Sequence, residues 1–231
     1  MRILAIESSA KTASVALVED GKLIAQNLQH AGLTHSKTLL PMIHALLDGL
    51  GMRAADTDKI AVAHGPGSFT GIRIGVATAK GLAFAADKPL IGVSTLEAMA
   101  HQAKHLGAGI ICPAMDARRG QVYNALFRTE GDRLIRLTED RAIAIEDLFA
   151  QPEYAVPYIL VGDGAALCHA WIQTDGIEAK ILPEHLVQQT AWGVAMAAQN
   201  LPGESVHDVN PQYIRPSQAE RERMERENLG G

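Results

Sequence analysis

The architecture of this chain depends on one segment, His64-Gly65-Pro66-Gly67-Ser68-Phe69-Thr70-Gly71-Ile72-Arg73-Ile74-Gly75-Val76. The short apolar run at 59–63, just before it, predicts a buried strand, and Gly65-Pro66-Gly67 then interrupts regular structure. Ser68 is suited to accept a hydrogen bond from the free N–H groups that open a helix. The segment therefore predicts a buried strand, a glycine turn and a long helix that continues to about residue 86.

Small residues recur at every fourth position of this helix. Gly71, Gly75, Ala79 and Ala83 fall on one helix face, although a glycine inside a helix costs about 1 kcal/mol relative to alanine. The pattern indicates that another backbone approaches this face closely. Two interpretations are open: the face packs on the chain's own sheet, as most buried surfaces do, or it docks on another subunit.

A glycine-rich loop that leads into a helix also suits an anion. The segment is not a Walker loop, because no Gly-Lys-Ser/Thr follows the glycines. The dinucleotide fingerprint fails as well, since glycines 65, 67 and 71 are spaced one residue too widely.

The composition favours an α/β protein. Of 231 residues, 47% are hydrophobic but only 4% are aromatic, so the cores must be built from Ala, Val, Ile and Leu. The net charge of −5 argues against a dedicated nucleic-acid binder. Cys112 and Cys168 are too few for a disulfide framework and indicate buried free thiols in a reducing cytoplasm. No uncharged run approaches the length of a membrane span, so no membrane partner is expected.

Hydrophobic periodicity in the first half predicts three strands joined by a meander, followed by alternating helices and strands. The expected strands are 3–6, 13–18, 22–29, 59–63 and 90–93, and the expected helices are 35–50, 69–86 and 95–106. This order predicts a mixed sheet with helices on both faces.

The second half repeats the beginning of the first. A buried strand ends at Asp116 as the first strand ends at Glu7, 116 − 7 = 109 residues earlier. The turn glycines Gly21 and Gly131 are 131 − 21 = 110 residues apart. Two markers at nearly one offset suggest a duplication.

We therefore predict an α/β, duplicated ribonuclease-H-like, two-domain fold of the actin, Hsp70 and sugar-kinase type, with domains at 1–106 and 107–231. Later helices are expected at 146–151, up to about 174, and near 190–200. The alternating Glu and Arg residues of 220–227 predict a solvated helical face or a frayed tail.

On such a fold, the first hairpin of each half would hold phosphates. The weak anion or nucleotide candidates are Ser8, Ser9, Lys11, Arg118 and Asp163. The first loop has no glycine to let its backbone approach a phosphate, so nucleotide binding stays open and catalysis on a nucleotide is not expected. A nuclease with a carboxylate cluster is excluded, because the strand at 59–63 ends in His64.

Other catalytic sites are poorly supported. His101 and His105 are four residues apart on one predicted helix, but Gln102 replaces the glutamate of a zincin and no third ligand is evident. Ser68 does not lie in a nucleophile elbow, so a capping role is the better interpretation. No catalytic residue, metal or cofactor is therefore expected.

The chain resembles the TsaB (YeaZ) family of tRNA threonylcarbamoyladenosine biosynthesis. The resemblance is carried by Gly65–Gly75 with Ala79–Ala83, His35-Ser36 with Leu39-Leu40-Pro41, Gly92–Leu96, Asp116-Ala117-Arg118 with Val122-Tyr123, and Pro211–Arg215. These matches span nearly the whole chain.

The resemblance implies a non-catalytic scaffold or activator subunit. In the family, it pairs with the paralogue TsaD and the ATPase TsaE for threonylcarbamoyl transfer to the adenosine beside the anticodon, and it meets tRNA through the complex. TsaD carries a metal-binding His-x-x-x-His where this chain has Thr95 and Met99, so no metal is implied here. The alternatives are an active ATP-dependent kinase and a metallopeptidase-like paralogue.

The resemblance also favours the second interpretation of the small-residue face. In the family, the helices at 35–50 and 69–86 pair with the same helices of TsaD, or of a second copy in a homodimer. The predicted interface residues are Leu39, Ile43, Ile72, Gly75, Val76 and Ala79. A Gly75→Leu substitution is accordingly expected to leave the fold largely intact and to abolish pairing.

Overall fold

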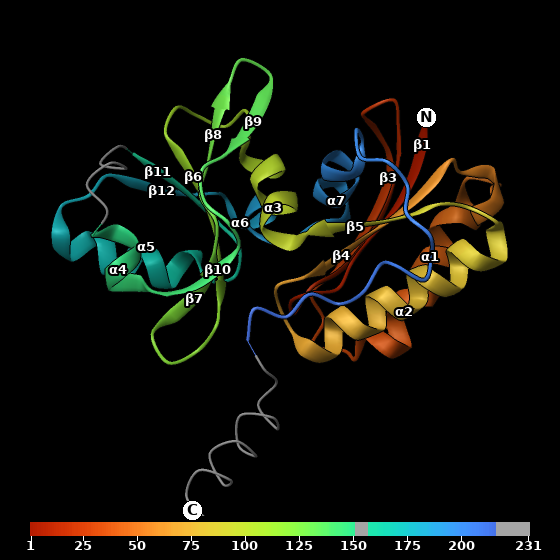
Figure 1. Ribbon diagram of the computed structural model, residues 1–231, viewed down its shortest axis with the longest axis horizontal. Coiled ribbons are helices and arrows are strands. Elements are labelled where there is room, and N and C mark those ends of the chain that lie inside the picture. The colour runs from red at the N-terminus through yellow and green to blue at the C-terminus, as the bar shows by residue number, and fades with distance from the viewer. Residues whose placement is uncertain (151–156, 216–231) are drawn as a thin grey trace, which may run out of the picture.

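The computed structural model describes residues 1–150 and 157–215, which form two lobes, each built on its own sheet (Figure 1). The first sheet has the order β3-β2-β1-β4-β5. Its strands are β1 (Arg2–Glu7), β2 (Ala13–Glu19), β3 (Lys22–Gln29), β4 (Lys59–Gly65) and β5 (Leu90–Ser94). The first three are antiparallel and the last two run parallel to β1, so the predicted mixed sheet is confirmed.

Both faces of the first sheet are covered. Its helices are α1 (His35–Gly49), the short 3-10 helix η1 (Ala54–Asp56), α2 (Phe69–Ala86), α3 (Thr95–Ala103) and α7 (Ala191–Ala198). Leu4 and Ile6 of β1 point to the core shared with α1 and α2, whereas Ile3 and Ala5 point to the core shared with α7. This alternation is the two-residue period of a strand that is buried on both faces.

The second sheet contains the path β10-β7-β6-β11-β12, with β8 and β9 attached through β6. Its strands are β6 (Ile110–Asp116), β7 (Gln121–Asn124), β8 (Phe127–Glu130), β9 (Arg133–Arg136), β10 (Arg141–Ala144), β11 (Tyr158–Val161) and β12 (Ala179–Ile181). Its helices are α4 (Ile145–Phe149), α5 (Ala165–Asp175) and α6 (Glu184–Val187). Strands β10 and β12 and helix α6 are too short to give a clear periodic pattern, and they were not predicted.

The duplication is visible position by position in the two sheets. In each, a central strand has an antiparallel neighbour on one side and a parallel neighbour on the other: β2 and β4 around β1, β7 and β11 around β6. The carboxylates Glu7 and Asp116 end equivalent strands, as predicted. The turn at Gly131 is not equivalent to the turn at Gly21, because it joins β8 to β9 while the counterpart of β3 is β10.

After the second lobe, the chain returns to the first lobe. Helix α7 packs on the first sheet through Val194, Ala195 and Ala198, and α3 lies beside it between the two sheets (Figure 1). A bridge between Leu90 and Glu204 then joins the following segment to β5. The predicted second domain, 107–231, therefore extends too far, because α7 and the segment after it, up to residue 215, pack on the first lobe. The predicted tail at 220–227 lies outside the described residues.

The small-residue face of α2 is buried against the chain itself. Gly71 and Gly75 of α2 pack directly against the loop that follows β1. A Cβ on either glycine would collide with Ser8 of that loop. Ala79 and Ala83 are fully buried in the core between α2 and the sheet. The close backbone approach indicated by the sequence is therefore an internal one.

Helix α2 begins at a capped end. The Ser68 Oγ accepts a hydrogen bond from the Gly71 backbone N–H at 3.2 Å, which confirms the predicted capping role. We expect Ser68→Ala to lower the free energy of unfolding by about 1 kcal/mol, which corresponds to a fall in Tm of roughly 2–4 °C for a chain of this size. Thermal unfolding followed by circular dichroism measures this, and Ser68→Asn, which keeps a capping oxygen, should retain the wild-type Tm.

Both cysteines are buried and free, as expected. None of the helices within the described ranges has the length and apolarity that crossing a membrane requires.

Candidate functional site

The loop after β1 holds the first group of predicted anion ligands. The Ser8 Oγ donates to the carbonyl of Gly71 at 2.9 Å and fixes the loop to the first turn of α2. Ser8 is fully buried there. The structure therefore assigns Ser8 a structural role and removes it from the candidate ligands.

The other four candidates lie together. Ser9, Lys11, Arg118 and Asp163 line one cavity of about 610 Å³ between the two lobes. Its wall also includes the start of α2 and the segment at 212–215. The topology explains this meeting: β1, β6 and β11 all end at the edge of their sheets that faces the cleft, so the loops that follow them converge.

A buried carboxyl group lies behind Ser9. Glu7 is fully buried, and its Oε1 accepts a hydrogen bond from the Ser9 backbone N–H at 2.6 Å. The Ser9 hydroxyl lies beside the Glu7 carboxyl group, although the Glu7 Oε2 and the Ser9 Oγ do not meet the geometry of a hydrogen bond with each other or with another described residue. Burial raises the pKa of Glu7 to about 7, against the opposing effect of the Ser9 hydroxyl and backbone. Glu7 was not predicted as a titrating residue, because sequence gives no measure of its desolvation.

A hydrogen bond from Gln189 fixes the Asp163 side chain. Its Oδ1 accepts a hydrogen bond from the Gln189 Nε2 at 2.9 Å, and burial raises its pKa. A Cβ on Gly162 or Gly164 would press on the backbone of Ala114. The glycines around Asp163 therefore serve internal packing of β11 against β6, and need no ligand to explain them.

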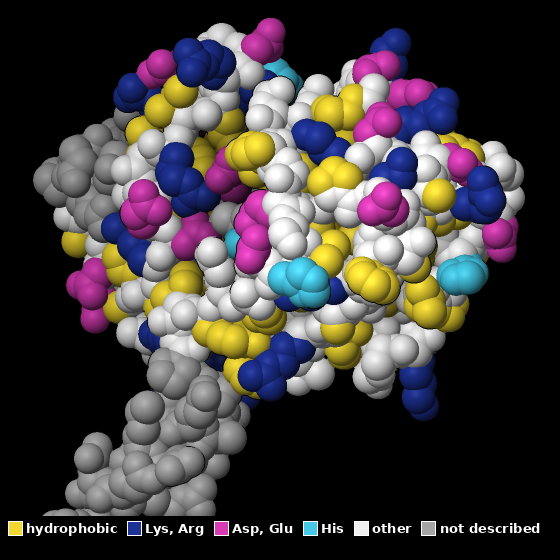
Figure 2. Space-filling model, turned by 45° about the vertical axis from the view of Figure 1, so that its right-hand side comes forward, with side chains coloured by type: hydrophobic (Ala, Val, Ile, Leu, Met, Phe, Trp, Pro, Cys, Tyr) yellow, Lys and Arg dark blue, Asp and Glu magenta, His cyan; other side chains and the backbone are white. Residues whose placement is uncertain are grey.

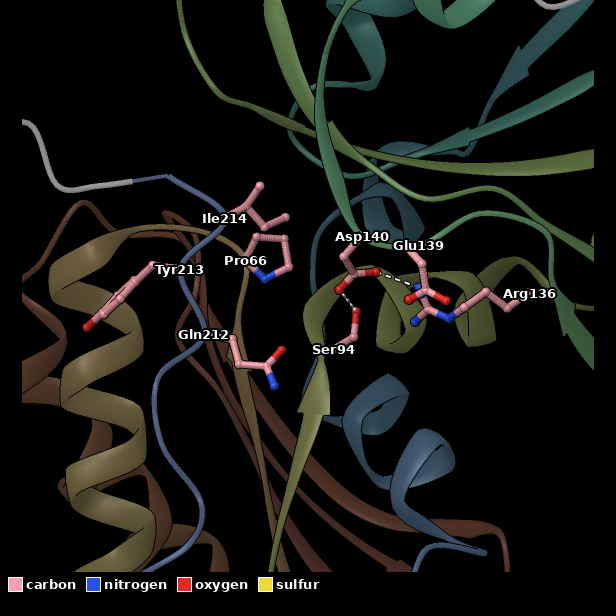
Figure 3. Close-up of a pocket in the computed structure, with 8 residues that line it drawn as sticks. All are labelled: Pro66, Ser94, Arg136, Glu139, Asp140, Gln212, Tyr213 and Ile214. Atoms are coloured by element: carbon pink, nitrogen blue, oxygen red, sulfur yellow. Dashed lines mark hydrogen bonds and ion pairs between the residues drawn. The ribbon is translucent and has the colours of Figure 1, made fainter. Parts of the chain in front are cut away.

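A second cavity, of about 490 Å³, opens on the other side of Pro66 (Figure 3). The Ser94 Oγ donates to the Asp140 Oδ2 at 2.5 Å, and the Arg136 Nη1 donates to the Asp140 Oδ1 at 2.6 Å. Arg136 also reaches Glu97 through its Nη2 at 2.8 Å. Arg136 therefore pairs with two carboxylates at once, and the network ties α3 to the loop after β9.

The residues considered as metal ligands in the sequence lie at Thr95 and Met99 and at the pair His101 and His105. Thr95 and Met99 are fully buried, and Met99 packs beside Gly162. His101 is partly buried, which lowers its pKa to about 4, whereas His105 is exposed beyond the end of α3. The two histidines therefore do not share a helix face, contrary to expectation. In the ranges 1–150 and 157–215, no three His, Cys, Asp or Glu side chains are grouped as a metal site requires.

The six predicted interface residues are in the core. Leu39, Ile43, Ile72, Gly75, Val76 and Ala79 are all buried between the two helices and the first sheet. The apolar side chains of β1, β2 and β4 require that cover, so these side chains cannot also meet a partner. The prediction of these particular residues is therefore corrected.

The outer face of the same two helices has different residues. Phe84 of α2 is 75% exposed and Leu40 of α1 is 44% exposed. Ala77, Gly81 and Ala85 form a second small-residue stripe on α2, and all three are exposed. This stripe has the same four-residue spacing as the buried one. The sequence analysis identified only the stripe that proves to be buried, and this second stripe was not predicted.

The segment that follows α7, residues 204–215, is a strap along α2. The Tyr213 ring stacks on Phe69 with centroids 4.6 Å apart, and the Arg73 Nε donates to the Tyr213 hydroxyl at 2.7 Å. Figure 3 shows Tyr213 turned toward α2 and Gln212 turned toward the second cavity. The Arg215 Nη1 then donates to the Ala117 carbonyl at 3.4 Å, across the cleft. The strap therefore joins the two lobes.

Comparison with known proteins gives one consistent family. The family model described as "TsaD: tRNA N6-adenosine threonylcarbamoyltransferase" matches residues 29–222. The chain is 34% identical to the tRNA threonylcarbamoyladenosine biosynthesis protein TsaB of Bacillus subtilis, over 95% of this chain and 96% of that protein. It is 36% identical to TsaB of Escherichia coli, over 71% of this chain and 72% of that protein.

A solved structure agrees with these relatives. A Pseudomonas aeruginosa protein described as uncharacterized, with similarity to peptidase YeaZ, superposes with a TM-score of 0.79 at 27% identity, over 93% of this chain and 99% of that one. The sequence matches and the shared fold point the same way. The chain belongs to the TsaB (YeaZ) family, whose members are named as tRNA threonylcarbamoyladenosine biosynthesis proteins.

Proposed function

We propose that this chain is a non-catalytic subunit of cytoplasmic tRNA threonylcarbamoyladenosine biosynthesis. It pairs through the outer face of α1 and α2 with a transferase of the TsaD family, is joined by the ATPase TsaE, and meets tRNA through the complex. Without the transferase, a second copy of the chain takes the same place. The match of a model described for the transferase to most of this chain supports a paralogous pair.

The observation that carries this proposal is Gly81 beside Phe84 on the outer face of α2. Phe84 is 75% exposed, and a Cβ on Gly81 would meet no atom within 4 Å. A glycine in an exposed helix interior costs about 1 kcal/mol, and no contact with residues 1–150 or 157–215 compensates for it. Close approach of a partner helix would use the space at Gly81 and would cover Phe84.

The state of the polar groups supports a non-catalytic role. Ser8 holds α2, Ser68 caps it, and Asp163 is bound to Gln189. Each of these groups has a structural partner, so a nucleophile or general base is not available from them. An assay of ATP turnover by the purified chain tests the kinase alternative directly, and we expect turnover at background level.

Pairing is tested by a charge on the outer face. We expect Phe84→Asp to weaken association with the transferase at least 30-fold, because a central aromatic side chain is commonly worth about 2 kcal/mol or more and a carboxylate would have to be desolvated. Sedimentation velocity and reconstituted tRNA modification measure the effect. The matched control is Leu167→Asp on α5, which is 45% exposed in the second lobe. Equal losses in both variants, or none in Phe84→Asp, would count against this interface.

A further inference from the structure

We propose that the free edge of β3 is a second interface, at which the first sheet pairs with the same strand of a second copy of this chain. The two five-stranded sheets then form one continuous sheet across a two-fold axis. This interface lies apart from the outer face of α1 and α2, so the inference does not depend on the pairing proposed above.

Strand β3 has an unpaired edge. It ends the strand order of the first sheet, and among the described residues it pairs only with β2. Within residues 1–150 and 157–215, no backbone group outside this hairpin is hydrogen-bonded to it. It is eight residues long, well beyond the very short strands with which proteins often protect an edge. Such a row of N–H and C=O groups without partners is a template for another strand.

The side chains along this edge are apolar and exposed. Leu23, Ile24 and Leu28 are 48%, 45% and 37% exposed. From Ile24 to Leu28, exposed and half-buried residues alternate, as a strand requires. Ala25 packs on the core beneath α1 and α2, so the exposed side chains lie on the opposite face of the sheet. The core shared with α7 on that face includes no residue of β3.

This edge has little of the protection that proteins usually give an edge strand, such as charged side chains or proline. Residues 23–29 contain neither. Elsewhere, in the view of Figure 2, acidic and basic side chains are interspersed among the apolar ones. The register with β2 shifts at Ile24, but residues 25–29 pair regularly. We therefore expect another strand to cover the edge.

The strand complements itself in one register. In an antiparallel pair of identical strands around a two-fold axis, opposite residues lie on the same face of the sheet. With Gln26 at the axis, Ile24 lies opposite Leu28 of the second copy, and Leu28 lies opposite Ile24 of the second copy. The two Gln26 amides, each a donor and an acceptor, can bond to one another. An axis at residue 25 or 27 would instead oppose one apolar side chain to Gln26 and the other to Lys22 or His30.

The charges also allow two copies to meet. Lys22 is the only charged residue of β3. In this register it lies opposite residue 30, and is therefore 30 − 22 = 8 positions from Lys22 of the second copy. At 3.4 Å per residue this separation is about 27 Å, well beyond the Debye length of roughly 8 Å in physiological salt. The pairing therefore brings no like charges together.

The C-terminal segment of the chain fits this edge less well. Seven of the eight residues at 220–227 are Glu or Arg, and such residues are disfavoured in strands. A run of alternating charges also offers little apolar surface to Leu23, Ile24 and Leu28. A second copy supplies both a strand and matching apolar side chains.

The test is sedimentation velocity of the full chain carrying Phe84→Asp, which blocks pairing through α1 and α2 and leaves β3 unchanged. Because a short strand pair is a small interface, concentrations up to about 500 µM are used. We expect a dimer whose fraction rises with concentration. Adding Ile24→Lys or Leu28→Lys should weaken it at least tenfold, since an edge lysine opposes strand pairing. Leu167→Lys on α5, at the same 45% exposure as Ile24, should leave the Kd within twofold.

Hydrogen exchange distinguishes strand pairing from contact between side chains alone. In the dimer, the outward N–H groups of β3 become hydrogen-bonded, so residues 22–29 should exchange more slowly at high than at low concentration. Ile24→Lys should abolish this concentration dependence. Its side chain is exposed, so the variant should keep the wild-type Tm, and circular dichroism melting excludes unfolding as the cause.

The remaining outcomes are also decisive. A Phe84→Asp chain that stays monomeric overturns the proposal, as does a dimer that Ile24→Lys leaves intact or that Leu167→Lys weakens equally. Slow exchange of residues 22–29 at every concentration overturns it too, and assigns the edge to another part of the same chain. If Phe84→Asp associates as wild type does and Ile24→Lys abolishes association, the β3 interface stands and self-association through α1 and α2 is wrong.

Discussion

Glu7→Gln is expected to make the protein about 3 kcal/mol more stable than wild type at pH 8 and equally stable at pH 4.5. Glu7 is fully buried, and its pKa is raised by burial from the ordinary 4.5 to about 7. A glutamine has nearly the shape of the protonated side chain and carries no charge at either pH. The difference between variant and wild type therefore measures the free-energy cost of ionising Glu7 inside the protein.

The sign follows from proton linkage. A group whose pKa is higher in the folded state contributes stability that is complete below its unfolded pKa and is lost as the pH rises through its folded pKa. For Glu7 the window is pH 4.5 to about 7. A pKa that is higher by one in the folded state than in the unfolded state corresponds to about 1.4 kcal/mol of stability. The contribution of Glu7 that is lost across this window is therefore about 3 kcal/mol.

Urea unfolding of both proteins at pH 4.5, 5.5, 7 and 8 measures this difference. Comparison at each pH cancels the effects of other groups, such as His64 and His101, whose pKa values are lowered by burial. Glu139→Gln, at an exposed position in the loop after β9, is the matched control and should follow wild type throughout. Parallel pH profiles for Glu7→Gln and wild type would mean that Glu7 is ionised in the folded protein without cost.

The first lobe was predictable because its elements are long and strongly periodic. The strand at 59–65 and the helix at 69–86 lie where the apolar run, the glycine turn and the Ser68 cap place them. The short strands of the second lobe give no such pattern, and their pairing depends on contacts with β6 and β11. The duplication was inferred correctly from Glu7 and Asp116, while the second marker, Gly131, belongs to an added hairpin.

The candidate site was predictable by residue type and not by orientation. Nothing in the sequence distinguishes Ser8, which bonds to Gly71, from Ser9, which faces the cleft. The strap at 204–215 has no periodicity, because its conformation depends on pairs such as Phe69 with Tyr213. The two small-residue stripes of α2 are equivalent as patterns, and only the sheet beneath one of them makes it the inner face.

This difference between the stripes gives a paired test, in which Gly75→Leu and Gly81→Leu have opposite effects on stability. At Gly75 a Cβ would collide with the Ser8 hydroxyl and lie 3.6 Å from the Val62 Cγ2. Moving Ser8 would break its buried hydrogen bond to Gly71. We expect Gly75→Leu to cost about 3 kcal/mol or more, from overpacking and the lost bond, and to lower the Tm by roughly 10 °C. This reverses the sequence-based expectation that the variant leaves the fold intact.

At Gly81 the same substitution meets open space. Leucine is a better helix former than glycine by roughly 0.8 kcal/mol, so Gly81→Leu should melt a few degrees above wild type. Its side chain would nevertheless hold a partner helix away from the outer face, and pairing with the transferase should be lost. Thermal unfolding and sedimentation velocity on both variants separate the two effects. Normal melting with failed pairing in Gly75→Leu would show that the inner and outer faces of α2 have been assigned the wrong way round, because only an exposed glycine can be filled without cost to the fold. Normal pairing in Gly81→Leu would show that the outer face of α2 does not meet the partner.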